Sequence, residues 1–123
     1  MKTAIVLLAD PNGGDEALGR LFNALALTYD LEQKGIPVEL VFQGAGTRWV
    51  NVVTQPDHPA HALYTAVAAS VAGVSCGCAD VFGARADAER TGFALLTDNA
   101  VPGTTGLASL ARYVRDGWTV LTF

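Results

Sequence analysis

Short runs of apolar residues alternate along the chain with longer amphipathic segments. Residues 3–9 form a continuous apolar run, which is typical of a strand covered on both faces in a parallel sheet. A turn sequence rich in Asp, Asn and Gly follows, and apolar side chains then recur at helical spacing from Leu18 to Tyr29. Lys34 and Gly35 provide the basic last turn and the glycine with which helices commonly end. The pattern therefore predicts a strand followed by a first helix.

The same alternation continues to the end of the chain. Further strands are predicted at residues 37–43, 74–76, 93–97 and 118–123. Further helices are predicted from residue 57 to the glycine at 73, from 79 to 90 with a bend or break at Gly83, and around residues 107–114. The segment 48–55 fits either a short helix or extended chain.

Five strands that alternate with four helices predict right-handed βαβ units and one parallel sheet between helical layers. The expected fold class is α/β, a three-layer α/β/α sandwich with a five-stranded, mainly parallel sheet of flavodoxin-like topology. The length suits one ordinary domain, so residues 1–123 are expected to form a single domain. Sites in such sheets lie at the carboxyl ends of the strands, which here are residues 10–15, 43–47, 76–78 and 97–105.

Composition narrows the classes of partner. The net charge is −4 and the eight basic residues are scattered singly, so neither nucleic acid nor an anionic membrane surface is an expected partner. Half of the residues are hydrophobic and 16% are charged, which favours a homo-oligomer that buries apolar surface between subunits. The apolar cluster Trp49, Val50, Val52 and Val53 is the expected contact. The first apolar run is too short for a signal sequence or a membrane span, so we expect a cytoplasmic protein.

Both cysteines of the chain lie where a short strand is expected to pass into a helix. Cys76 and Cys78 flank Gly77, and the free N–H groups of a helix start favour a thiolate, the form that attacks, accepts sulfur or binds metal. A structural disulfide between them is disfavoured because it would close a very small, strained ring. The alternative is that each is a small buried hydrophobic residue. We favour reactive thiols, with Arg85 and Arg90 as candidate cationic neighbours.

The residues present disfavour three other types of site. A receiver domain needs an acidic residue after the third strand, where this chain has Cys76. A phosphate site at Gly13 and the glycine after it is disfavoured by neighbouring acidic side chains. A zinc site built from His58 and His61 with the two cysteines has the wrong spacing for a zinc finger, so we expect no metal ion and no other cofactor.

Four stretches carry a family resemblance, at residues 4–9, 38–46, 76–83 and 117–123. By their order and spacing the chain resembles the DsrE/DsrF-like family of small α/β proteins over nearly its whole length. The resemblance implies a cysteine at the end of the third strand that carries a persulfide and passes sulfur to a partner, within symmetric trimers or hexamers. Several relatives have two cysteines separated by two residues in this loop. Ser75 stands at the first of those positions here and Cys78 at the second.

The resemblance therefore implies a persulfide carrier in intracellular sulfur transfer, a sulfurtransferase-like role with a donor and an acceptor protein as partners. Cys78 is the first candidate for the sulfur-bearing residue and Cys76 the second. The pocket around them is expected to include Asp10, Gly44, Gly46, Gly77 and Asn99. The alternative is a non-catalytic, oligomeric module that binds a small ligand or another protein.

Overall fold

Five parallel strands form one sheet in the computed structural model, which describes residues 1–123. The strands are β1 (Thr3–Leu7), β2 (Val38–Phe42), β3 (Val71–Ser75), β4 (Leu95–Leu96) and β5 (Thr119–Thr122). Their order is β4-β3-β2-β1-β5. The predicted α/β class and parallel sheet are confirmed. Doubly wound sheets of the flavodoxin type run 2-1-3-4-5, so this strand order differs from theirs.

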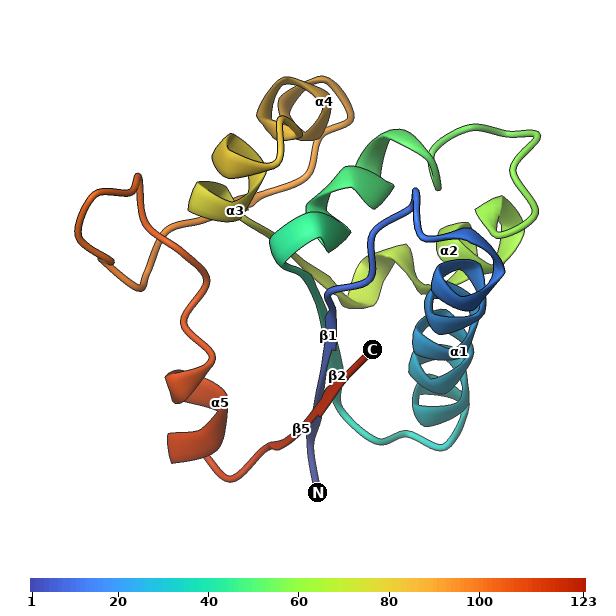
Figure 1. Cartoon of the computed structure of the whole chain (residues 1–123). Helices are drawn as coiled ribbons and strands as arrows, with labels where there is room; N and C mark the ends of the chain where they lie inside the picture. Colours follow the sequence, from blue (N-terminus) through green and yellow to red (C-terminus); the bar gives the residue numbers. More distant parts are fainter.

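Helices cover both faces of the sheet and its carboxyl edge. The α-helices are α1 (Gly14–Gln33), α2 (His61–Val67), α3 (Cys76–Val81), α4 (Arg85–Arg90) and α5 (Ala111–Arg115), and the 3₁₀ helices are η1 (Gly44–Asn51) and η2 (Ala68–Ser70). Figure 1 shows α1 and α2 on one side of the sheet, α5 on the other, and α3 with α4 beyond the carboxyl end of the strands. None of the helices is both long and apolar enough to cross a membrane.

The larger core is one cluster of 17 buried residues, which lies under α1 and α2 and continues to η1, α3 and α4. This cluster includes Trp49, Val50 and Val53, all at most 2% exposed. Val52 is half-buried and packs against the same cluster. The expectation that these four residues form an exposed subunit contact is therefore wrong. The segment folds as η1 and the turn after it, so its apolar residues share a face that packs inward. The indole N–H of Trp49 also donates to the Ala9 carbonyl at 2.7 Å.

A smaller cluster on the opposite face fixes α5. Its buried members are Ala4, Val41, Ala108 and Tyr113. The Tyr113 hydroxyl donates to the Glu39 carboxylate, which also accepts from Arg112 at 3.3 Å. Burial first, and then the Glu39 hydrogen bond, raise the pKa of Tyr113 above its ordinary value. The short α5 is thus held by one aromatic side chain with a carboxylate partner on β2.

Several element boundaries differ from the predicted ones. β3 begins at Val71, inside the predicted second helix, because Gly73 is a strand residue and not a helix stop. A Cβ on Gly73 would lie 2.5 Å from the Ala94 carbonyl oxygen, so the glycine allows the chain leading into β4 to approach β3. The predicted break at Gly83 is confirmed, since α3 and α4 are separate helices on either side of it. Leu107 lies outside the last helix.

Candidate functional site

The two cysteines lie in α3, directly after β3 and at the carboxyl edge of the sheet. Cys76 is the first residue of this helix and Cys78 the third, and both are free thiols. Residues two positions apart on a helix do not face each other. Cys76 is 2% exposed, whereas Cys78 is partly exposed. The two thiols therefore lie on different sides of α3 and differ in access to solvent.

Cys76 contacts the loop that follows β4. Its Sγ lies 3.3 Å from the hydroxyl oxygen of Thr105. The Thr105 hydroxyl donates to Oδ2 of Asp80 at 2.6 Å, and Asp80 also accepts from Arg85 at 3.2 Å. These four residues, hereafter the Cys76 network, join the start of α3, its next turn, the start of α4 and the loop.

The charged members of the Cys76 network are Asp80 and Arg85. The Thr105 hydrogen bond, followed by the Arg85 contacts, holds the pKa of Asp80 below its ordinary value. Hydrogen bonds to Glu89 and Asp80 raise the pKa of Arg85, and a charge on Cys76 would raise it further. Asp80 is thus an anion and Arg85 a cation at neutral pH. Of the two predicted cationic neighbours, Arg85 is joined to Cys76 through this network.

The other candidate, Arg90, is turned to different partners. Its guanidinium donates to Asn51 at 2.8 Å and to Asp87 at 3.2 Å. The helix α4 has six residues, so Arg85 and Arg90 lie at its opposite ends. Of the two, only Arg85 lies at the end of α4 that is close to α3 and its thiols.

A second group of residues lies on the Cys78 side of α3. The Phe82 N–H donates to the Cys78 carbonyl at 2.9 Å, which places Phe82 one helical turn after Cys78 on the same face. Arg48 from η1 donates to the Phe82 carbonyl at 3.1 Å and to the Asp10 carboxylate at 3.0 Å. Its guanidinium also lies over the Phe82 ring, 5.4 Å from the centroid. Arg48 therefore ties the segment after β1 to the end of α3, one helical turn beyond the more exposed thiol.

Gly77 lines a cavity of about 250 Å³ together with Asp80, Val81 and the loop residues Gly103, Thr104 and Thr105. Its N–H donates to the Gly106 carbonyl at 2.7 Å. A Cβ at Gly77 would lie 2.6 Å from a methyl carbon of Leu107. Gly77 thus allows the loop to pack closely on α3, and its N–H is occupied by that contact.

Asn99 acts through its backbone. Its N–H donates to the Leu107 carbonyl and its carbonyl accepts from the Leu107 N–H, both at 2.8 Å. This pair closes residues 99–107 into a hairpin that carries Thr105. The Ala108 N–H then donates to the buried hydroxyl of Ser75 at 3.0 Å, which fastens the hairpin to the end of β3.

Gly44 and Gly46 line none of the four cavities. Gly44 has a φ of +58°, which begins the turn from β2 into η1. A Cβ on Gly46 would lie 2.1 Å from the Leu7 carbonyl oxygen. These glycines let η1 pack against the end of β1, and so they position Arg48 without contacting either thiol.

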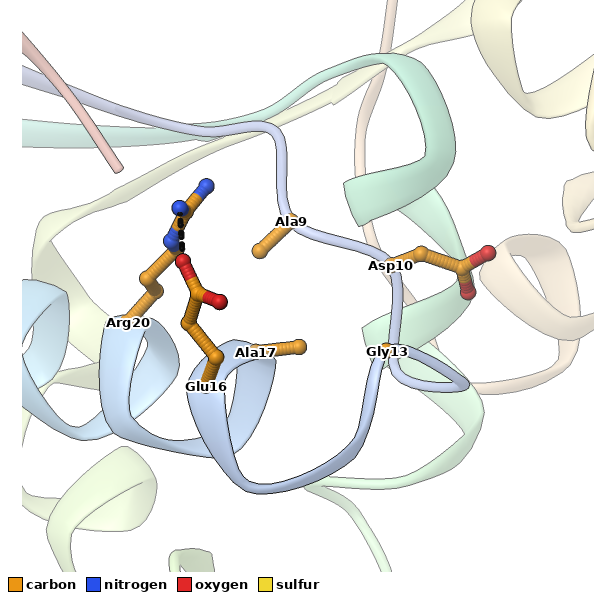
Figure 2. A pocket seen from close by; sticks show the side chains of 6 residues that line it. All are labelled: Ala9, Asp10, Gly13, Glu16, Ala17 and Arg20. Atoms are coloured by element: carbon orange, nitrogen blue, oxygen red, sulfur yellow. Dashed lines mark hydrogen bonds and ion pairs between the residues drawn. The ribbon is translucent and has the colours of Figure 1, made fainter.

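Asp10 lines a separate cavity of about 220 Å³ at the start of α1, together with Ala9, Gly13, Glu16, Ala17 and Arg20. Figure 2 shows its carboxylate turned away from the ion pair between Glu16 and Arg20. The Glu16 carboxylate at this helix start agrees with the sequence argument against a phosphate there. Asp10 instead pairs with Arg48, which connects it to Phe82 at the end of α3.

The considered zinc arrangement is not assembled. No three His, Cys, Asp or Glu side chains gather in a way that could hold a metal ion. His58 accepts from the Ala60 N–H at 3.0 Å, and His61 lies 2.8 Å from the Val53 carbonyl. Both imidazoles therefore have local partners near the start of α2.

Sequence reasoning missed Thr105, Asp80 and Arg48 as neighbours of the thiols. Asp80 lies four residues after Cys76, a spacing that places both on one helix face once α3 is known to begin at Cys76. Arg48 was visible as the one basic residue beside the glycine-rich exit of β2. The contact with Thr105 spans 29 positions and has no local signal.

Comparisons with known proteins give two matches. The family model described as the DsrE/DsrF-like family matches residues 1–123. A solved structure, described as a conserved protein of unknown function, BT1422 from Bacteroides thetaiotaomicron, has a TM-score of 0.61 and 14% sequence identity. The match covers 98% of this chain and 94% of that one, and at this identity it shows the fold alone. Comparison with curated proteins gives no match.

Proposed function

Because the chain belongs to the DsrE/DsrF-like family over its whole length, we propose that it is a persulfide carrier in intracellular sulfur transfer. Cys78 is the thiol that accepts sulfur. The observation that carries this assignment is the difference in exposure, since Cys78 is partly exposed and Cys76 is 2% exposed. A sulfur atom can reach Cys78 without any movement of the hairpin that covers Cys76.

The proposed cycle conserves electrons. The Cys78 thiolate attacks the terminal sulfur of a donor persulfide, a new S–S bond forms, and the donor leaves as a thiolate. An acceptor thiolate then attacks the outer sulfur of the Cys78 persulfide, and Cys78 leaves as a thiolate. Each step breaks one S–S bond and forms another, so neither an oxidant nor a metal ion is required.

Exposure supports Cys78 more strongly than the helix start does. The helix α3 has only six residues, and the Gly77 N–H is already bonded to the Gly106 carbonyl. Few backbone donors are therefore left for an anionic sulfur. Arg48 contacts Phe82, one helical turn after Cys78, and places a positive charge at that end of α3.

The proposed carrier is cytoplasmic. A carrier with a free thiol belongs in the cytoplasm, where thiols are kept reduced. Its partners are a persulfide donor and a thiol acceptor, and the carrier itself is a trimer or hexamer, as the family resemblance implies. The competing function is a non-catalytic module that binds a small ligand or another protein.

Intact mass after exposure to a persulfide donor separates these functions. The parent chain and Cys76→Ser are expected to gain one sulfur atom, which a reductant then removes. Cys78→Ser is expected to gain none. Uptake by Cys78→Ser but not by Cys76→Ser would reverse the two roles, and a parent chain that gains no sulfur would favour the binding module.

A further inference from the structure

In the Cys76 network, the position of the Thr105 hydroxyl proton decides whether Cys76 is protonated. An ionised carboxylate can only accept hydrogen bonds, and a threonine hydroxyl has a single proton to donate. Asp80 is ionised at neutral pH, because its partners hold its pKa below the ordinary value. The Thr105 proton is therefore given to Asp80, at 2.6 Å.

The Thr105 oxygen that faces Cys76 can consequently act only as an acceptor. At the 3.3 Å separation of Sγ and Oγ1, the hydrogen bond requires Cys76 to be the donor and to retain its proton. A Cys76 thiolate would face a hydroxyl oxygen with no proton to offer. From this geometry we infer that Asp80 is a positioning residue, which acts through Thr105 to hold Cys76 as a protonated thiol.

A second consequence rests on the proposed function. If Cys76 is held as a donor beneath the hairpin, incoming sulfur is directed to Cys78. The two cysteines then have distinct roles, one as a fixed hydrogen-bond donor and the other as the carrier. The two cysteines of the S-C-x-C sequence at residues 75–78 are therefore not equivalent.

The charged groups around Cys76 explain why Asp80 controls whether Cys76 is a thiol or a thiolate. Arg85 attracts negative charge at Cys76, while Glu89 binds Arg85 from its far side at 3.1 Å. The hairpin of residues 99–107 carries no charged side chain, and Asp98 just before it accepts from the Ser109 N–H and pairs with Arg112. Removal of the Asp80 carboxylate would free the Thr105 proton and leave Arg85 without its carboxylate partner on α3. Both changes favour a thiolate at Cys76.

Alkylation of Cys76 tests the inference directly. All variants carry Cys78→Ser, so that Cys76 is the only thiol, and iodoacetamide labelling at neutral pH is followed by intact mass. Asp80→Ala is expected to speed labelling about tenfold or more, the effect of one hydrogen bond to a charged group. Thr105→Ser, which keeps the hydroxyl, is expected to label at the parent rate.

The double variant separates proton control from simple uncovering of the thiol. In the Thr105→Val background, Asp80→Ala is expected to speed labelling much less than in the parent background, because no hydroxyl remains to donate and only the loss of the Asp80–Arg85 pair still acts. Equal acceleration by Asp80→Ala with and without the Thr105 hydroxyl would overturn the inference, as would no acceleration at all. Asp80→Asn, which keeps a neutral acceptor, is expected to give a smaller increase and serves if Asp80→Ala does not fold.

This measurement uses no sulfur donor, so it is independent of the proposed function. Acceleration by Asp80→Ala in a chain that takes up no sulfur would support the role of Asp80 and reject the carrier. Sulfur uptake at Cys78 together with unchanged labelling of Cys76 would support the carrier and reject the role of Asp80.

Discussion

Arg48 donates to the Asp10 carboxylate at 3.0 Å, although the two residues are 38 positions apart in the sequence. The same guanidinium donates to the Phe82 carbonyl. One side chain from η1 thus joins the segments that follow β1 and β3. Because Phe82 shares a helix face with Cys78, this junction supports the side of α3 on which the proposed sulfur carrier lies.

Replacement of Arg48 by alanine is expected to lower the free energy of unfolding by about 1–2 kcal/mol, since one ion pair and one hydrogen bond are lost. Arg20→Ala is the matched control, because its ion pair with Glu16 is more exposed and is expected to contribute less than about 0.5 kcal/mol. Urea unfolding measures both. The variant at Arg48 is also expected to load sulfur more slowly at Cys78. Equal losses of stability for the two variants would contradict the central position of Arg48.

A methyl group at Gly46 is expected to be severely destabilising. Its Cβ would lie 2.1 Å from the Leu7 carbonyl oxygen, and neither backbone can move without separating η1 from β1. Gly46→Ala is expected to cost about 3 kcal/mol or more. Gly19→Ala in α1, where nothing lies within 4 Å of the added carbon, is expected to stabilise the chain by up to about 1 kcal/mol. Thermal unfolding of the pair checks the sign of each change.

Stability should fall in strongly alkaline solution because of Tyr113. Its pKa is raised in the folded state, so the neutral phenol is favoured there. This contribution is complete below the ordinary value of 10.0 and is lost as the pH rises above it, because the unfolded chain ionises first. Tyr113→Phe is expected to be less stable at neutral pH, by about 1 kcal/mol, and to lose less stability between pH 9 and pH 11.

The control for this experiment is Tyr29→Phe, since Tyr29 is 43% exposed. Its unfolding free energy is expected to follow the parent chain at every pH. Parallel curves for the parent and Tyr113→Phe would show that the buried phenol does not contribute to the alkaline loss.

We expect Val53, in the turn after η1, to stabilise the core of a single subunit and not a contact between subunits. Val53→Ala removes buried methyl groups and should lower the free energy of unfolding by about 2 kcal/mol. Light scattering of the folded variant should give the same molar mass as the parent chain. Val114→Ala, at a side chain that is 69% exposed, provides the control for stability. A change of molar mass in Val53→Ala alone would contradict the placement of this residue in the core.

Hydrophobic periodicity was sufficient to predict the parallel sheet, because strands buried on both faces are continuous apolar runs. Periodicity failed where the same residue type is compatible with two different structural roles. Gly73 resembles a helix stop, yet it lies in β3 because the chain before β4 passes too close for a side chain. The Trp49 segment was expected to expose its apolar side chains, yet they meet the core through a short 3₁₀ helix, one of the two conformations that its sequence fits.

The candidate site was predictable only in part, for a related reason. The carboxyl ends of parallel strands meet at one edge, so the position of the two cysteines followed from topology. Their different surroundings did not, because the hairpin that covers Cys76 begins more than 20 positions further along the chain. No local pattern in that hairpin indicates that Thr105, rather than a neighbour, will face the thiol.

The strand order has a consequence for how the chain folds. β1 lies between β2 and β5, and Thr3 is paired with Thr119. One edge of the first strand therefore stays without a partner until nearly the whole chain has been synthesised. Pairing of such distant segments is slow, because a long loop must close before any contact forms. We expect β2, β3 and α1 to assemble on β1 first, with attachment of β5 as the late step that completes the sheet.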